Sequence, residues 1–500
     1  MRTLLTADHV LAFDGTSHTE LRDGAVLVED DRIAWVGAAA SLPPATVAEI
    51  DERIDLGPAL LMPGLIDLDA LTDVDHLLLD SWGDAAHATR LTWSEDYFDR
   101  RRHVFTEAER RRVREVALVQ LALHGITSYM PIASEVHSEW AESADDFLAM
   151  AEYSRTLGLR GFLGPSYRSG VGVVTADGRR DVRFDEQAGR DGLDDAIRFV
   201  DAVRALGDPL LTGVFLPCRI ETLTPELMEA TARAADERGA LVRIHALQGA
   251  FERSYIQATY GRTPLEHLAA HGLLHDRVLV PHGTVIDIDP RVHGEDRGDL
   301  ARIAAAGVAI VHCPLTNARY GSELVSLSRY REAGVAFALG TDSFPPDLIR
   351  GIDTGVSAAK VQHGDTAAGD VAAYVDAATL GGAAALHRPD LGRIAAGATA
   401  DLTAFRLDDV RMGAIDDPLR TLVLAGTARD ACLTMVAGRV VMRDGEIAGV
   451  DLAEVRRDMQ ALFETMRAAY GERDRYRGTA GDLFPPVYPV ADTAAFEEHA

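Results

Sequence analysis

The stretch Leu241-Val-Arg-Ile-His-Ala-Leu-Gln248 carries the pattern that decides the fold: a short apolar run that ends at a polar side chain. Three later runs end in the same way, at His282, His312 and Asp342. Amphipathic segments lie between such runs; residues 224–238, for example, begin with Thr-Pro-Glu and repeat apolar residues at helical spacing. Alternating strands and helices predict a (β/α)8 barrel, in which chemistry takes place at the carboxyl ends of the strands.

Both ends of the chain have a different pattern. Short apolar strands separated by Asp and Gly turns fill the first forty residues and return after residue 400. We therefore predict an α/β protein with a small composite β-sandwich formed by both ends of the chain. The predicted division is residues 1–58 and 389–450 for the two parts of the β-sandwich, 59–388 for the barrel, and 451–500 for a C-terminal helix and extended tail.

Composition excludes several classes of function. The formal net charge of −28 argues against nucleic acid binding, which needs a basic surface. No apolar run approaches the roughly twenty residues that a membrane helix needs, and the first residues lack the pattern of a signal peptide. A soluble cytoplasmic protein with a small-molecule substrate is expected. Cys218, Cys313 and Cys432 are widely spaced, which favours free thiols over disulfides.

Several motifs occur together along the chain. Residues 61–71 read Leu-Met-Pro-Gly-Leu-Ile-Asp-Leu-Asp-Ala-Leu, and residues 396–402 read Ala-Gly-Ala-Thr-Ala-Asp-Leu. With the segments around His245, His282 and Asp342, they resemble the amidohydrolase superfamily, in particular its cytosine deaminase, guanine deaminase and triazine chlorohydrolase branch. The resemblance covers nearly the whole chain and implies a barrel hydrolase with a metal at its strand ends.

The resemblance assigns roles to individual residues. It implies that His245 on the fifth strand and Asp342 on the eighth bind a metal, and that His282 on the sixth steers water or substrate. His245, His282 and Asp342 are thus the expected catalytic set. The residues expected to contact the substrate are Gln248, Arg168, His312 and Asn317.

The chain departs from the pattern of these enzymes at its first strand. Where they have His-x-His, it has Asp69 and Leu71, and where they have an acid–base glutamate it has Gln248. A carboxylate can bind zinc or iron, whereas Leu71 cannot. The only lysine is Lys360, which excludes a two-metal centre bridged by a carbamylated lysine. Two alternatives stay open. One is a single zinc or iron ion held by an unusual set from Asp69, His245, His282 and Asp342, with Asp69, His245 and Asp342 as the expected ligands; the other is a site without metal.

Further polar groups lie near Asp69 in the sequence. They are Asp67, Asp73, Asp75, His76 and His87. An acidic run of this kind is also typical of a solvated loop, which is the interpretation favoured for Asp73 and Asp75.

The expected function is hydrolysis of a C–N or C–halogen bond on a small, nitrogen-containing ring. One alternative is an elimination or isomerisation that uses His245 and Asp342 as acid and base. Another is a catalytically silent subunit that binds a small molecule, because fold alone does not rank these functions. The apolar, proline-rich tail after residue 480 predicts a homo-oligomer.

Overall fold

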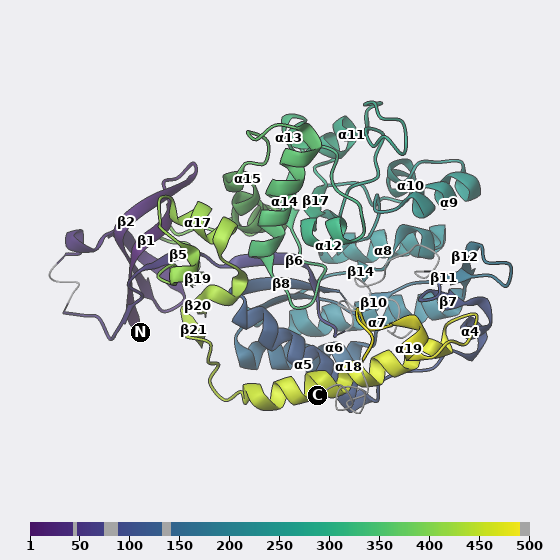
Figure 1. Cartoon of the computed structure of the whole chain (residues 1–500), viewed down its shortest axis with the longest axis horizontal. Coiled ribbons are helices and arrows are strands. Elements are labelled where there is room, and N and C mark those ends of the chain that lie inside the picture. The colour runs from purple at the N-terminus through teal and green to yellow at the C-terminus, as the bar shows by residue number, and fades with distance from the viewer. Residues whose placement is uncertain (44–47, 75–88, 133–141, 491–500) are drawn as a thin grey trace, which may run out of the picture.

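Eight parallel strands form the central barrel of this computed structural model, which describes residues 1–43, 48–74, 89–132 and 142–490 (Figure 1). The strands are β6 (Leu65–Leu71), β8 (Ile126–Ile132), β9 (Arg160–Leu163), β13 (Leu211–Gly213), β15 (Val242–Arg243), β16 (Val278–Pro281), β17 (Ala309–His312) and β18 (Ala336–Leu339). They pair in two sets of four, β6-β8-β9-β13 and β15-β16-β17-β18. The predicted barrel is confirmed.

Two contacts close the barrel. A parallel bridge between Phe215 and Val242 joins the two sets of strands. On the other side, the amide of Asp342 donates a hydrogen bond to the carbonyl of Asp69 over 2.8 Å, so the eighth strand returns to the first. Closure places the polar residues that follow distant strands around one centre.

Helices cover the outside of the barrel. They include α5 (Glu107–Leu123), α6 (Ala144–Leu157), α7 (Glu186–Leu206), α8 (Pro225–Arg238), α10 (Pro264–Ala270), α11 (Asp299–Ala306) and α14 (Leu348–His363). Helix α8 shows why the sequence forms them: the Thr224 side chain accepts the amide of Leu227, Pro225 opens the first turn, and Gly239 ends the helix at φ 59°.

An apolar cluster fills the inside of the barrel below the strand ends. Its buried members include Ile66, Leu68, Met130, Phe162, Leu241, Leu279, Val311 and Ala338, which come from seven of the eight strands or the residues that lead into them. Because side chains alternate along a strand, Arg243 and His245 share the interior face with Leu241. An arginine on this face of the fifth strand therefore lies at the centre of the molecule.

Both ends of the chain build the β-domain. Its strands are β1 (Arg2–Phe13), β2 (His18–Glu29), β3 (Arg32–Ala38), β4 (Glu52–Asp55), β5 (Ala59–Pro63), β19 (Leu402–Arg406), β20 (Ala431–Val436) and β21 (Arg439–Arg443). They form one hydrogen-bonded sheet in the order β21-β20-β19-β5-β1-β2-β3, with β4 beside β1. The composite domain was predicted, but β5 pairs with β1 and β19, so the boundary set after residue 58 falls too early.

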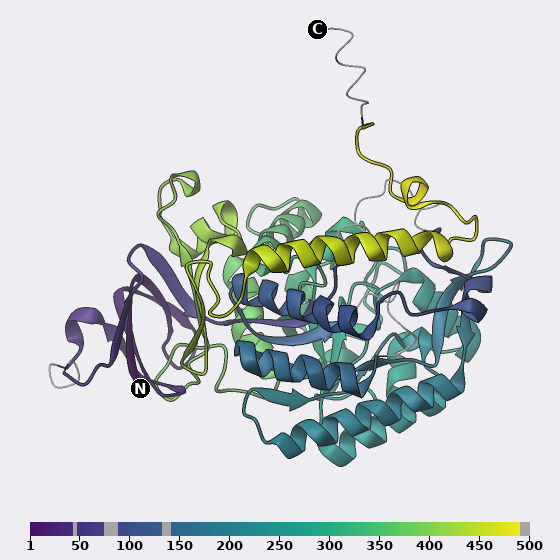
Figure 2. The same cartoon turned by 90° about the horizontal axis from the view of Figure 1, so that it is seen from below.

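The C-terminal segment packs along its own barrel. Helix α18 (Leu452–Ala469) lies beside α5, and the short helix α19 (Ala480–Leu483) follows it (Figure 2). An apolar cluster joins this segment to the barrel domain, with Leu462, Met466, Tyr470, Leu483 and Phe484 on one side and Val74, Leu91, Phe105 and Val113 on the other. The Arg112–Asp458 ion pair, at 2.7 Å, adds to it. The homo-oligomer was predicted because the apolar tail needed a covering surface. Up to Phe484, the chain's own barrel domain supplies that surface, so no second subunit is needed to bury these residues.

The expected homo-oligomer stays a prediction. It now rests on Val487, Tyr488 and Val490, which are 90%, 82% and 86% exposed and are the apolar side chains of the tail that a second subunit would cover. Deleting residues 485–500 is expected to change the Tm by less than about 2 °C, since the buried cluster stays intact. We expect size-exclusion elution to shift toward a smaller species. Unchanged elution would contradict the prediction, and deletion from Leu452 onward is the control that should lower the Tm.

No described helix is long and apolar enough to cross a membrane. All three cysteines have free thiols, as predicted.

Candidate active site

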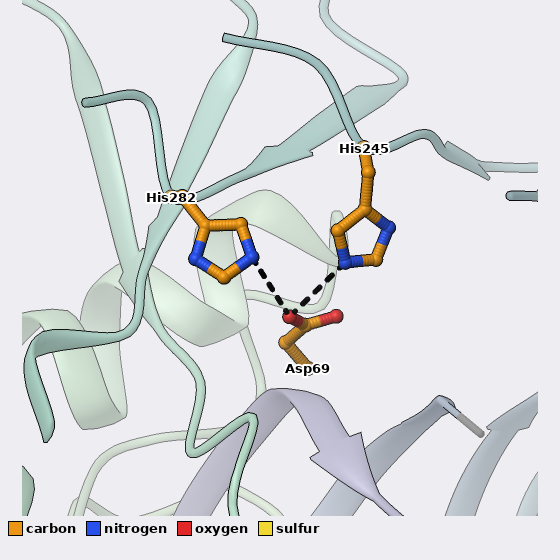
Figure 3. Close-up of side chains that lie close together, drawn as sticks. All are labelled: Asp69, His245 and His282. Atoms are coloured by element: carbon orange, nitrogen blue, oxygen red, sulfur yellow. Dashed lines mark ion pairs between the residues drawn. The ribbon is translucent and has the colours of Figure 1, made fainter. Parts of the chain in front are cut away.

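Three side chains from different strands meet at the carboxyl end of the barrel (Figure 3). His245 and His282 both direct Nε2 toward Oδ2 of Asp69, at 3.5 and 4.0 Å. One ligand atom of each residue lies within 4.8 Å of the other two, and all three residues are buried. Asp342 lies beside them, with Oδ2 3.7 Å from Nε2 of His282. The sequence had placed all four residues in the site, and they lie close together here. The possible metal cluster, however, contains His282 where Asp342 was the expected ligand, and the roles of the four residues stay predictions.

Strained backbone holds this arrangement. Leu247, His282 and Asp342 have positive φ values of 61°, 66° and 40°, a region that residues other than glycine rarely occupy. Each such residue costs on the order of 1–3 kcal/mol. At His282, the backbone N–H donates to the carbonyl of Val311 over 2.8 Å, and this bond fixes the strained backbone of that residue. Strain at three positions around one centre is typical of a functional site, where the surrounding fold imposes a geometry that the local sequence does not favour.

A chain of buried polar groups orients His282. Its Nδ1 lies 2.9 Å from Oδ1 of Asn317, and the amide nitrogen of Asn317 faces Nδ1 of His312 over 3.4 Å. Nε2 of His312 is 3.0 Å from Oε1 of Glu323. With this orientation of the amide, His282 carries its proton on Nδ1 and directs the lone pair of Nε2 toward the carboxylates of Asp69 and Asp342. The contacts show that His312 and Asn317 support His282; their predicted contact with substrate stays a prediction.

The unprotonated nitrogen of His282 needs a positive partner. Burial lowers the pKa of its imidazole to about 3, although Asp69 acts in the opposite direction. Nε2 is buried and has no hydrogen-bond partner among the described residues. A lone pair that faces two carboxylate oxygens is electrostatically unfavourable unless a cation lies between them.

Asp69 is shared between the histidines and two other groups. Its Oδ1 lies 3.1 Å from Nη1 of Arg243, and the thiol of Cys313 donates to Oδ2 over 3.7 Å. Burial acts to raise the pKa of Asp69, but His245 and Arg243 outweigh it, and the pKa falls below its ordinary value. Gly340 allows the eighth strand to approach, because a Cβ there would lie 2.5 Å from that of Asp69. Asp69 is therefore an ionised, tightly enclosed carboxylate.

Asp67 has a different role from Asp69. Thr341 donates to its two carboxylate oxygens, from the amide over 3.0 Å and from the hydroxyl over 2.6 Å. Burial raises the pKa of Asp67 to about 6, although these hydrogen bonds oppose the shift. Asp67 thus connects the first strand to the loop that carries Asp342, and it is not part of the cluster of Asp69, His245 and His282. Asp73 is buried, which contradicts its assignment to a solvated loop, while Asp75, His76 and His87 lie outside the described residues.

Gln248 follows His245 by three positions, where the resemblance implies a glutamate. It is half-buried, and the guanidinium of Arg219 donates to its Oε1. The backbone N–H groups of Gln248 and Leu247 donate to the buried carboxylate of Glu252 over 3.0 and 2.7 Å. Burial, with Glu221 adding to it, raises the pKa of Glu252 to about 8. Glu252 therefore holds the turn after the fifth strand, and the amide NH2 of Gln248 remains as a donor.

Two arginines need separate mention. Arg168, predicted to bind substrate, is buried, with its guanidinium 5.8 Å from the ring centre of Trp93, and its contact with substrate stays a prediction. Arg243 was not predicted, although it stands two positions before His245 and so faces the same side of the strand. An arginine inside an apolar run, two positions before a predicted site residue, is the sequence feature that could have indicated Arg243.

Comparison with known proteins gives the family. The model of the amidohydrolase family matches residues 90–441, and a model of an imidazolonepropionase-like composite domain of bacteria matches residues 24–45. The first match spans most of the chain. The chain belongs to the amidohydrolase family.

Its relatives include several deaminases. A 5-methylthioadenosine/S-adenosylhomocysteine deaminase from Halobacterium salinarum is 31% identical, over 90% of this chain and 95% of the relative. An 8-oxoguanine deaminase from Pseudomonas aeruginosa is 26% identical, over 89% and 94%. Among solved structures, an atrazine chlorohydrolase from Arthrobacter aurescens complexed with zinc superposes with a TM-score of 0.72 at 23% identity, over 92% of this chain and 100% of that one. These similarities agree with the barrel and the added β-domain.

The residues present fit a single divalent ion. Two imidazole nitrogens and a carboxylate oxygen are the ligand types that zinc takes, and three of them with an open position are typical of catalytic sites. The buried nitrogen of His282 supplies an independent reason, because it lacks the positive partner that an ion would be. Leu71, in place of a second first-strand histidine, is buried among apolar side chains and adds no ligand.

Proposed function

We propose that this amidohydrolase hydrolyses a C–N or C–halogen bond on a small, nitrogen-containing ring. The observation that carries the proposal is the convergence of Asp69, His245 and His282 at the strand ends of the barrel. These three would hold one ion, with Asp342 beside His282. When bound, a divalent ion lowers the pKa of water and makes a nucleophile available near neutral pH.

The protein's own side chains would divide the remaining work. Asp342 is the carboxylate placed to take a proton from the attacking water and return it to the leaving nitrogen, because Gln248 cannot move a proton. The water oxygen forms a bond to the ring carbon, and the amine leaves as ammonia or the halogen as halide. Oε1 of Gln248 accepts a hydrogen bond from Arg219. The side-chain NH2 of Gln248 would donate to a ring nitrogen or carbonyl of the substrate.

A substrate panel in H2(18)O tests this reaction class. The compounds are those in the names of the relatives, 5-methylthioadenosine, S-adenosylhomocysteine, 8-oxoguanine and atrazine, with other amino- and chloro-substituted purines, pyrimidines and triazines. We expect at least one compound to release ammonia or halide and to gain one labelled oxygen. Turnover without labelled oxygen would favour elimination or isomerisation, and binding without turnover, seen as a raised Tm, would favour a silent binding subunit.

A further inference from the structure

Arg243 is the unexpected group at the centre of this barrel. Its guanidinium is buried on the inner face of the fifth strand, where few charged side chains are found unless they are paired. Nη1 lies 3.1 Å from Oδ1 of Asp69. The same fork donates to two carbonyls of the second strand, β8: Met130 over 3.3 Å and Pro131 over 2.8 Å. One side chain thus connects the first, second and fifth strands at the level of the site.

Charge explains why the two unusual residues occur together. By the resemblance, a histidine, which binds metal in its neutral form, would stand where this chain has Asp69. An aspartate alone would add a buried negative charge, and a permanently charged guanidinium beside it removes that charge. Asp69 and Arg243 together are therefore neutral, like the histidine they stand in for. This pairing is independent of which substrate the protein takes.

The pairing also limits what Asp69 can offer a metal. Oδ1 faces Arg243, so only Oδ2 faces His245 and His282. A divalent ion bound there would lie close to a fixed positive charge, and repulsion between the two is strong in a buried site. Arg243 thus opposes the ion while it holds Asp69 in place.

We propose that Arg243 is a built-in counter-charge that replaces part of the metal's structural role: its contact with Oδ1 holds Asp69 in position without an ion, and its charge weakens metal binding. The protein should therefore remain folded when metal is removed, and zinc should bind through one oxygen of Asp69 with at most one ion per chain. Arg243 acts through Asp69 and is a positioning residue.

Zinc titration of the full-length protein and two variants tests the proposal. Arg243→Met removes the charge and keeps the length of the side chain; we expect zinc to bind at least about tenfold more tightly, measured by calorimetry with zinc chloride alone. Arg243→Lys keeps the charge and loses the fork, so its zinc affinity should stay near that of the wild type. Both variants should lower the Tm in the presence of chelator, because both lose hydrogen bonds to Met130 and Pro131.

A second buried pair provides the matched control. Arg160 and Asp401 are both buried, contact each other over 2.8 and 3.0 Å, and join the third barrel strand to the β-domain. Arg160→Met should lower the Tm without changing zinc affinity. If Arg243→Met and Arg160→Met affect zinc equally, Arg243 has only a structural role and the proposal is overturned.

Two further measurements test the proposal if Arg243→Met does not fold. The wild type treated with chelator should lose less than about 2 °C of Tm, and a loss above about 10 °C would mean that the ion, and not Arg243, holds the site. The double variant Asp69→Asn with Arg243→Met removes both charges together and should recover Tm relative to Arg243→Met alone. A double variant no more stable than the single one would contradict the pairing.

Discussion

Asp342→Asn is expected to lower kcat by roughly 10³-fold while the protein stays folded, which is the range that a lost general acid–base group produces. Asn removes the ability to move a proton but keeps a similar shape, and it tolerates the positive φ of 40° at this position. Asp342 lies next to His282. It is the carboxylate proposed to take a proton from the attacking water and then to give it to the leaving group. Steady-state kinetics on the best substrate of the panel gives the measurement.

The controls for this prediction separate chemistry from folding. KM should change much less than kcat, because Gln248 and not Asp342 is proposed to hold the ring. Asp365→Asn, on an exposed loop after α14, should leave both constants unchanged. An Asp342→Asn enzyme that turns over at nearly the wild-type rate would remove Asp342 from the catalytic set.

Asp69→Asn is expected to abolish both metal binding and activity. It takes away the carboxylate that faces His245 and His282, and it leaves Arg243 buried without its counter-charge. Breaking a buried pair in this way costs about 3–5 kcal/mol, so a lower Tm is part of the expected result. Metal content after purification and zinc titration are the two measurements, and circular dichroism at the working temperature shows that the variant is still folded.

Two further variants make the assignment of Asp69 specific. Asp69→His restores the ligand type of the resembling enzymes and should retain some metal. Asp67→Asn should also retain metal, because the Thr341 hydroxyl can accept a hydrogen bond from the new amide as well as donate one. Metal content near zero in every preparation with activity intact would mean acid–base catalysis without an ion. Two tightly bound ions per chain would mean that the ligands are misassigned.

The sequence by itself determined the architecture. Apolar runs of strand length, capped helices such as Pro225–Arg238 and the return of strand patterns after residue 400 are local features, and each is set by residues a few positions apart. The strand-end positions of His245, His282 and Asp342 followed from the same patterns, since chemistry in a barrel gathers at one end. Their convergence was therefore predictable, although no distance between them was.

Only the tertiary structure decided what surrounds those residues. The contact of Arg243 with Asp69 crosses the barrel between the fifth and first strands, and its strength depends on closure of the sheet, which no local spacing encodes. The hydrogen bond from His282 to Asn317, which sets the direction of the lone pair, likewise joins two neighbouring strand ends. The tail up to Phe484 looked unpartnered along the sequence because its partners lie on α5 and the loops before it. Burial and charge pairing between distant segments are properties of the folded chain, and they determine the chemistry of this site.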